Sequence, residues 1–282
     1  MKEASEWGFG KPSSLVKMDF FKFDSEEGIL MPFFRYEGVN VYYKVVGKGN
    51  TPLLFLHGNT ASSKMFKPKV KFYAERFRVI LIDYPGHGKS EMLQEFPVDY
   101  WCYNARVAIK LCQTLKCNKV NLIGTSGGAI VALNMVLIEP LLVGKIIADS
   151  FPGESQNCED IVTLRDQRKK AKGSISSVLF WFLMHGLRWK KVVDADTKMI
   201  ELSSLTRKGF YCGDLSEITV PVLITGSLKD ELIKDMEFRM ETLSNRLKNS
   251  KLVFYPTGSH PAMFSNSREF DNLALEFLEI NC

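Results

Sequence analysis

The chain has 282 residues, of which 45% are hydrophobic and 24% are charged, and its formal net charge at pH 7 is +5. This composition is that of an ordinary globular protein, and it excludes a disordered or collagen-like chain. The positive excess is spread along the sequence without a basic stretch interleaved with aromatic residues, so we expect no nucleic-acid partner.

The cysteines and the apolar segments indicate the compartment. The six cysteines form no Cys-x-x-Cys pair and have no metal-ligand spacing with the four histidines, so we expect free thiols, no metal site and no cofactor. The N-terminus lacks an uninterrupted apolar core, and no segment approaches the roughly 18 apolar residues that a membrane helix needs. The sequence therefore predicts a cytoplasmic protein without a membrane span.

The fold is expected to begin near residue 31. Residues 1–30 show no strong periodicity, and we expect them to form an N-terminal extension. The next stretch, "MPFFRYEGVNVYYKVVGKGN", alternates apolar and polar residues around Gly38, Val39 and Asn40. This pattern predicts a β-hairpin at the start of the fold.

Short apolar runs alternate with helix-length segments over the rest of the chain. The runs are "PLLFLHG", "FRVILIDYPG", "KVNLIGTSGG", "GKIIADSFPG", "VPVLITGS" and "KLVFYPTGS". Continuous apolar runs of this length are typical of parallel strands that are buried on both faces. Segments such as "DYWCYNARVAIKLCQTL" separate them, so the sequence predicts an α/β fold in which helices cover both faces of a mostly parallel central sheet.

The alternation is interrupted once, over residues 152–216, where a helical pattern separates two predicted strands. In an open parallel sheet, ligands bind outside the carboxyl ends of the strands, and an insertion that leaves a strand at that end would cover the site. We therefore expect residues 152–216 to form a small helical lid on a core of residues 31–151 and 217–282.

Ser126 lies in the stretch "LIGTSGGAI", between a predicted strand and a predicted helix. Gly124 and Gly128 flank it at the spacing G-x-S-x-G, the nucleophile elbow, in which a sharp strand-to-helix turn exposes the serine hydroxyl. The stretch has neither the G-K-[ST] of a phosphate-binding loop nor the G-x-G-x-x-G of a dinucleotide site. Ser126 is therefore the candidate nucleophile.

A serine nucleophile needs a base, and four histidines are available. His57 and His87 lie upstream of the serine, and His185 lies in the apolar part of the expected lid. His260 follows the last predicted strand, where the chain order serine, acid, histidine is completed. We therefore expect His260 to be the base and the other histidines to have structural roles.

Two aspartates compete for the acid that orients the histidine. Asp230 follows the strand in "VPVLITGSLKDELI", beside the expected position of His260, whereas Asp149 ends the preceding strand. The sequence favours Asp230 and leaves Asp149 as the alternative. The oxyanion needs two N–H donors, and these are expected from the backbone of Gly127 and Asn59.

Taken together, "LHGN", "DYPGHGKS", "GTSGG", "GSLKDE" and "GSHP" resemble the motifs of the α/β-hydrolase fold superfamily over about residues 32–282. The resemblance implies a triad of Ser126, Asp230 and His260, with Asn59 and Gly127 as oxyanion donors. It also excludes the branches with an aspartate nucleophile, because the nucleophile position of the elbow is occupied by Ser126. The sequence departs from common serine branches at Gly127, where a larger residue often stands.

The expected substrate is a small apolar ester or acyl compound. In the lid, "VLFWFLMHGLRW" offers Phe180, Trp181, Phe182 and Met184 as candidate pocket residues. The leading function is a serine hydrolase of carboxylic esters, thioesters or related acyl bonds through an acyl-enzyme. Two alternatives stay open: a carbon-carbon bond hydrolase or cofactor-free peroxidase on the same triad, and a ligand sensor or signalling partner with little or no turnover.

Overall fold

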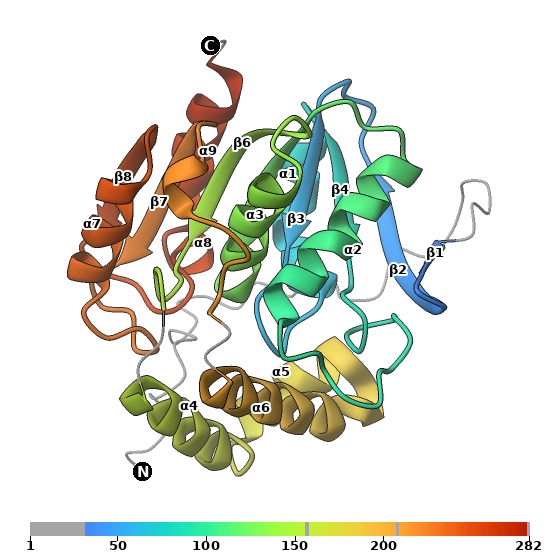
Figure 1. Ribbon diagram of the computed structural model, residues 1–282, viewed down its shortest axis with the longest axis vertical. Helices are drawn as coiled ribbons and strands as arrows, with labels where there is room; N and C mark the ends of the chain where they lie inside the picture. The colour runs from blue at the N-terminus through green and yellow to red at the C-terminus, as the bar shows by residue number, and fades with distance from the viewer. Residues whose placement is uncertain (1–31, 156–157, 207–208, 281–282) are drawn as a thin grey trace, which may run out of the picture.

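The computed structural model describes residues 32–155, 158–206 and 209–280, and within these residues an eight-stranded sheet has the order β1-β2-β4-β3-β5-β6-β7-β8 (Figure 1). The strands are β1 (Phe33–Tyr36), β2 (Val39–Val46), β3 (Pro52–Leu56), β4 (Arg78–Ile82), β5 (Val120–Thr125), β6 (Val143–Asp149), β7 (Val222–Ser227) and β8 (Ser250–Tyr255). Strand β2 pairs antiparallel with both β1 and β4, and the remaining pairs are parallel. The expected mostly parallel sheet is confirmed.

Helices cover both faces of this sheet. They are α1 (Lys67–Ala74), α2 (Tyr100–Thr114), α3 (Gly127–Ile138), α7 (Met236–Arg246), α8 (Ala262–Ser265) and α9 (Ser267–Glu279). Helices α2 and α3 lie on the face turned to the viewer in Figure 1, whereas α1, α8 and α9 lie behind the sheet. The expected extension, residues 1–30, lies outside the described residues.

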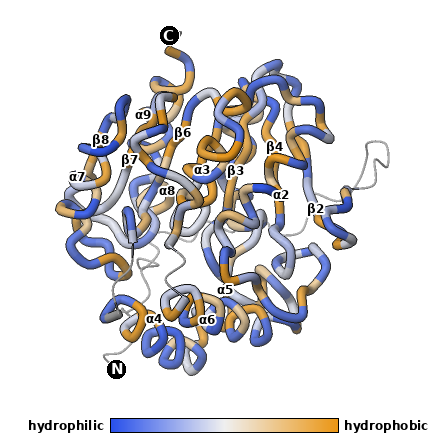
Figure 2. Tube along the Cα trace, in the orientation of Figure 1, coloured by the Kyte–Doolittle hydropathy of each residue, from blue (hydrophilic) through white to orange (hydrophobic). Residues whose placement is uncertain are grey.

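Alternation along the strands divides the core into two layers. In β3, Leu54 and Leu56 pack with α2 and α3, whereas Leu53 and Phe55 pack with α1, α8 and α9. Successive side chains of a strand point to opposite faces, so a continuous apolar run serves both layers at once. Figure 2 shows the consequence, with hydrophobic residues concentrated in the strands and α3 and more hydrophilic residues in the outer helices.

The opening hairpin turns slightly earlier than its pattern indicates. Its two strands are joined by Glu37 and Gly38, whose φ angles are 47° and 84°. Two consecutive positive φ values match the twist of an antiparallel pair, and glycine adopts such a value without steric cost. Val39 and Asn40, expected near the turn, already belong to β2.

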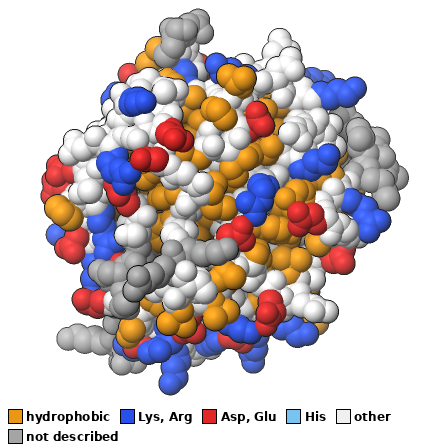
Figure 3. Space-filling model, in the orientation of Figure 1, with side chains coloured by type: hydrophobic (Ala, Val, Ile, Leu, Met, Phe, Trp, Pro, Cys, Tyr) orange, Lys and Arg blue, Asp and Glu red, His pale blue; other side chains and the backbone are white. Residues whose placement is uncertain are grey.

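Three helices fill most of the segment between β6 and β7. These are α4 (Cys158–Ala171), α5 (Ile175–His185) and α6 (Trp189–Leu205), and they lie across the carboxyl ends of the parallel strands (Figure 1). Lys and Arg side chains gather along this lower edge of the molecule in Figure 3. None of the helices in the described residues combines the length and the apolar character needed to cross a bilayer.

Candidate active site

Ser126 occupies the turn between β5 and α3 in a strained backbone conformation, with φ 54° and ψ −128°. Its N–H donates to the carbonyl oxygen of Asp149 over 2.8 Å, which fixes the turn against β6. A Cβ at Gly124 would lie 2.3 Å from the carbonyl oxygen of Gly128, and one at Gly128 would lie 2.0 Å from that of Leu56. The two flanking glycines are therefore required by close backbone contact, as the elbow motif predicts.

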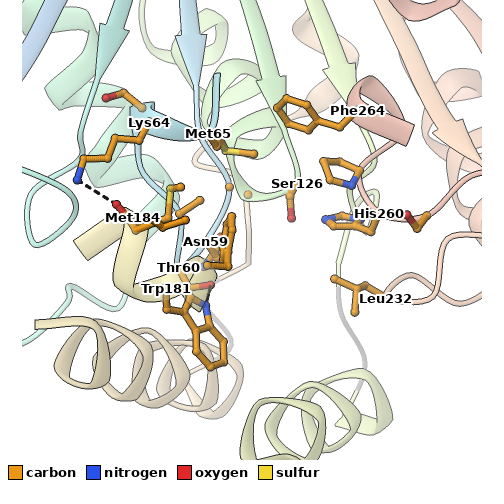
Figure 4. Close-up of a pocket in the computed structure, with 18 of the residues that line it drawn as sticks. Asn59, Thr60, Lys64, Met65, Ser126, Trp181, Met184, Leu232, His260 and Phe264 are labelled. Carbon is orange, nitrogen blue, oxygen red and sulfur yellow. Dashed lines mark hydrogen bonds between the residues drawn. The ribbon is translucent and has the colours of Figure 1, made fainter. Parts of the chain in front are cut away.

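A hydrogen-bonded acid and imidazole lie next to this elbow. The His260 Nδ1 donates to the Asp230 Oδ2 over 2.8 Å, and the Asp230 side chain is fully buried. The other carboxylate oxygen accepts from the N–H groups of Leu232 and Ile233, at 2.9 and 3.1 Å. Because a carboxylate only accepts, Nδ1 carries the proton and Nε2 is left as the basic nitrogen. The imidazole faces the Ser126 hydroxyl in Figure 4.

The surroundings of His260 favour its protonated form on balance. Burial lowers the pKa of the imidazole, but the Asp230 carboxylate opposes this effect and the net pKa lies above the ordinary value. Asp149 and Glu231 add smaller contributions in the same direction. An imidazole whose protonated form is stabilised in this way accepts a proton readily, as a general base must.

Asp149, the alternative acid, is engaged elsewhere. Its carboxylate accepts hydrogen bonds from the hydroxyls of Thr225 and Thr125, at 2.8 and 3.1 Å, and from the N–H of Met263 at 3.1 Å. Burial raises its pKa to about 6. The geometry therefore favours Asp230 over Asp149 as the partner of His260.

The loop after β3 approaches the elbow closely. A Cβ at Gly58 would lie 2.9 Å from the Ser126 Cβ, so glycine permits the approach. The Asn59 N–H makes no hydrogen bond to the backbone of any described residue. Gly127 is the first residue of α3, so its N–H has no partner within the helix. Both N–H groups are thus available at this point of the site.

The Asn59 side chain fills the space that Gly127 leaves. A Cβ at position 127 would lie 1.8 Å from the Asn59 Oδ1. This oxygen accepts from the Trp101 indole N–H at 3.4 Å, and the amide nitrogen donates to the Asp196 Oδ2 at 2.8 Å. Sequence reasoning did not find Trp101 or Asp196, because each comes from a distant helix and neither lies in a local motif.

Comparison with known proteins agrees with this geometry. The family model of the α/β-hydrolase fold matches residues 51–172. The chain is 27% identical over 251 residues to serine hydrolase BPHL of Homo sapiens, and the alignment covers 86% of this chain and 84% of BPHL. It is 28% identical over 280 residues to a 2-hydroxy-6-oxononadienedioate/2-hydroxy-6-oxononatrienedioate hydrolase of Burkholderia vietnamiensis, with coverages of 85% and 91%.

Solved structures show the same fold. The esterase EaEST from Exiguobacterium antarcticum matches with a TM-score of 0.67 at 22% identity, and the match covers 86% of this chain and 97% of the esterase. The chain has the α/β-hydrolase fold. It is an enzyme of this fold, and the different names of its relatives support hydrolase activity without one common substrate.

Two further histidines connect loops near the site. His57 contacts the carbonyl oxygen of Gly58 at 2.9 Å through Nδ1 and accepts from the Tyr84 N–H at 3.2 Å. His185 donates to the carbonyl oxygen of Thr60 at 2.9 Å and accepts from the Gly88 N–H at 3.0 Å. Burial lowers the pKa of each to about 4. Both are neutral structural residues, as expected.

A large cavity opens above Ser126 and His260, between the sheet and the helices α4 to α6. Phe180, Trp181 and Met184 line it, as the sequence suggests. Phe182 does not, because its side chain is 46% exposed and borders a small groove on the outside of α5. The pattern of α5 could not separate these neighbours, since the helix is apolar on both its inner and its outer face.

Further apolar side chains line the cavity from other elements. They are Trp101, Ile130, Leu164, Ile200, Phe210 and Leu232. The rings of Trp101 and Phe210 meet edge to face with centroids 4.7 Å apart. All six come from helices or loops outside α5, and no sequence motif marks them as pocket residues. The cavity wall beside the nucleophile is therefore predominantly apolar.

Proposed function

We propose that this α/β-hydrolase is a serine hydrolase that cleaves small carboxylic ester, thioester or related acyl bonds through an acyl-enzyme on Ser126. The observation that carries the proposal is the position of the Asp230–His260 pair, joined over 2.8 Å, with the imidazole facing the elbow serine at the base of an apolar cavity. This combination supplies a nucleophile, its base and a binding space at one point.

The proposed reaction follows from the atoms involved. His260 Nε2 accepts the Ser126 proton as the hydroxyl oxygen attacks the acyl carbon, and Asp230 stabilises the resulting imidazolium. The N–H groups of Asn59 and Gly127 stabilise the oxyanion. The imidazolium then protonates the leaving group, and water hydrolyses the acyl-enzyme with His260 again as base.

The cavity wall supports an apolar acyl or alcohol group as the substrate. Apolar side chains dominate the wall, and each square ångström of apolar surface that a substrate buries there contributes about 25 cal/mol. We also propose that residues 152–216 act as the lid that bounds this cavity. The buried thiols of Cys102, Cys112 and Cys117 are unpaired, which is compatible with the proposed cytoplasmic location.

The test combines labelling with turnover. The protein is treated with a fluorophosphonate probe, the adduct is mapped by mass spectrometry, and hydrolysis of p-nitrophenyl esters is measured for the wild type and Ser126→Ala. We expect labelling at Ser126 and a loss of turnover of several orders of magnitude in the variant. Labelling without turnover would point to a ligand sensor, and cleavage of diketones but not esters would point to a carbon-carbon bond hydrolase.

A further inference from the structure

Asp196 is a buried carboxylate in α6 that reaches the candidate oxyanion loop. Its side chain is fully buried, and its Oδ2 accepts from the Asn59 amide over 2.8 Å. Its Oδ1 lies 2.5 Å from Nη2 of Arg168, a residue of α4 whose side chain is 8% exposed. One carboxylate thus joins two helices of the segment above the sheet to the loop after β3.

Stability alone gives little reason for this arrangement. A buried ion pair loses hydration on both partners, and apolar side chains of similar volume often stabilise a fold as well or better. Burial raises the pKa of Asp196, whereas Arg168 and Asn59 oppose that rise. The net pKa lies above the ordinary value, and the Arg168 guanidinium and the Asn59 amide are the two groups that stabilise the charged carboxylate.

The partners of the Asn59 amide fix its orientation. The Trp101 indole can only donate and an ionised Asp196 can only accept, so the amide oxygen must face Trp101 and the nitrogen must face Asp196. This orientation keeps the side chain over Gly127. Without Asp196, the amide nitrogen would lose its acceptor and the side chain could leave that space.

The Asn59 side chain is one of several restraints on the backbone of this loop. Gly58 precedes it, and Thr60 follows with a positive φ of 56°, an uncommon value for a residue with a branched side chain. Thr60 is itself held by α5, through the Trp181 indole at 3.2 Å and His185 at 2.9 Å. The Gly58 carbonyl oxygen, which lies in the same peptide plane as the Asn59 N–H, is contacted by His57 and accepts from the Ala61 N–H. The Asn59 side chain adds a further restraint on the direction of this peptide from the Gly127 side.

We propose that Asp196 is a positioning residue for the oxyanion donors. By holding the Asn59 side chain over Gly127, it directs the Asn59 N–H toward the same point as the Gly127 N–H, and Arg168 offsets a negative charge that would otherwise oppose the oxyanion. The inference rests on the proposed acyl transfer at Ser126. Preorganised donors act mainly in the transition state, so their disturbance lowers kcat more than it raises KM.

The experiment measures kcat and KM for Asp196→Asn on the best p-nitrophenyl ester. Removal of a whole oxyanion donor costs about 10² to 10³ in kcat, so misplacement of one is expected to cost about 10- to 100-fold, with KM within about threefold. The matched control is Asp194→Asn in the same helix, whose carboxylate is 61% exposed and pairs with Lys172. This control should keep kcat within about twofold, and thermal melting checks that both variants fold.

A double-mutant cycle with Asn59→Ala tests whether Asp196 affects kcat through the Asn59 side chain. If Asp196 acts through the Asn59 side chain, Asn59→Ala should lower kcat similarly, and the double variant should be no more than about threefold worse than either single variant. If the loss of kcat in the double variant equalled the product of the two single losses, the inference would be overturned. Gly127→Ala provides a second approach, because its Cβ would displace Asn59 from the other side, and a similar loss of kcat is expected.

Ser126→Ala in the same assay separates the two proposals. Turnover that persists in Ser126→Ala overturns the proposed function and this inference with it. Turnover that depends on Ser126 but is unchanged in Asp196→Asn overturns the inference alone. A rise in KM at constant kcat in Asp196→Asn would also overturn it, because that result indicates a role in substrate binding.

Discussion

The backbone N–H of Met263 donates to the Asp149 Oδ2 over 3.1 Å and so fastens the segment just after His260 to the end of β6. The same carboxylate accepts from Thr125, the residue before Ser126, and from Thr225 in β7, the strand that leads to Asp230. Asp149 thereby joins the three chain segments that carry the candidate triad. These hydrogen bonds give Asp149 a structural role that does not require it to be the acid.

Asp230→Asn is expected to lower kcat by about 10³ to 10⁴, because an amide at this position favours the wrong tautomer of His260 and leaves the imidazolium without its stabilising charge. Asp149→Asn should lower kcat far less. It should instead reduce the free energy of unfolding by about 1 to 3 kcal/mol, since an amide cannot accept at both positions of the carboxylate. Steady-state kinetics and denaturant unfolding of both variants provide the comparison.

If Asp149→Asn lowered kcat more than Asp230→Asn did, the acid of the triad would be Asp149 at the end of β6. For that conclusion to hold, both variants must be folded, which circular dichroism and the cooperativity of unfolding establish. The sulfonyl or phosphonyl labelling rate of Ser126 adds an independent readout, because it reports activation of the nucleophile without hydrolysis. We expect Asp230→Asn to slow labelling and Asp149→Asn to leave it within about threefold.

The pH dependence of kcat/KM should reflect the raised pKa of His260. The base must be neutral to accept the serine proton, so activity is expected to fall as the pH drops below that pKa, with a midpoint above the ordinary value of about 6.5. Since the Asp230 carboxylate opposes the effect of burial, Asp230→Asn should move the midpoint to lower pH. Residual activity of the variant over a pH series measures this shift, and an unchanged midpoint would contradict the pairing.

The sequence predicts the sheet and the elbow because both depend on local patterns. Apolar runs bounded by glycine become the parallel strands, and the G-x-S-x-G spacing around Ser126 reflects backbone contacts within one turn. Asp196 and Phe210 reach the site through packing of the segment above the sheet, and no local pattern carries that information. Phe182 fails as a pocket residue for the same reason, because hydrophobicity alone does not tell which side of α5 meets the cavity.

Acid is expected to destabilise the fold through its buried histidines. His57 and His185 have pKa values lowered to about 4, whereas the unfolded value is about 6.5. The unfolded chain thus binds more protons between these values. The stability that the neutral rings contribute is complete above pH 6.5 and is lost as the pH falls toward 4, by at most about 3 kcal/mol for each ring. Thermal melting from pH 8 to pH 4 measures this loss.

The variant His185→Gln measures how much of that acid destabilisation comes from the titration of His185. A glutamine can donate to the Thr60 carbonyl oxygen and accept from the Gly88 N–H, as His185 does, but it does not titrate. The variant should be somewhat less stable at pH 7 and should lose less stability between pH 6.5 and pH 4 than the wild type. An equal loss in both proteins would assign the acid sensitivity to other groups.

Chain-length preference is expected to depend on the side of α5 that faces the cavity. Phe180 lines the cavity, whereas Phe182 in the same helix is 46% exposed on the outside, so the two phenylalanines form a matched pair. Trimming Phe180 to alanine should change the preference among esters from acetate to decanoate by roughly 1 to 3 kcal/mol, since it removes apolar contact with the acyl chain. Phe182→Ala should leave the ranking of kcat/KM values as it is in the wild type. Fluorophosphonate labelling of Ser126 checks that the site is intact in both. If both variants kept the wild-type ranking, the acyl pocket would have to lie along Trp101, Ile130 and Phe210 instead, and Ile130→Ala would then be expected to shift it.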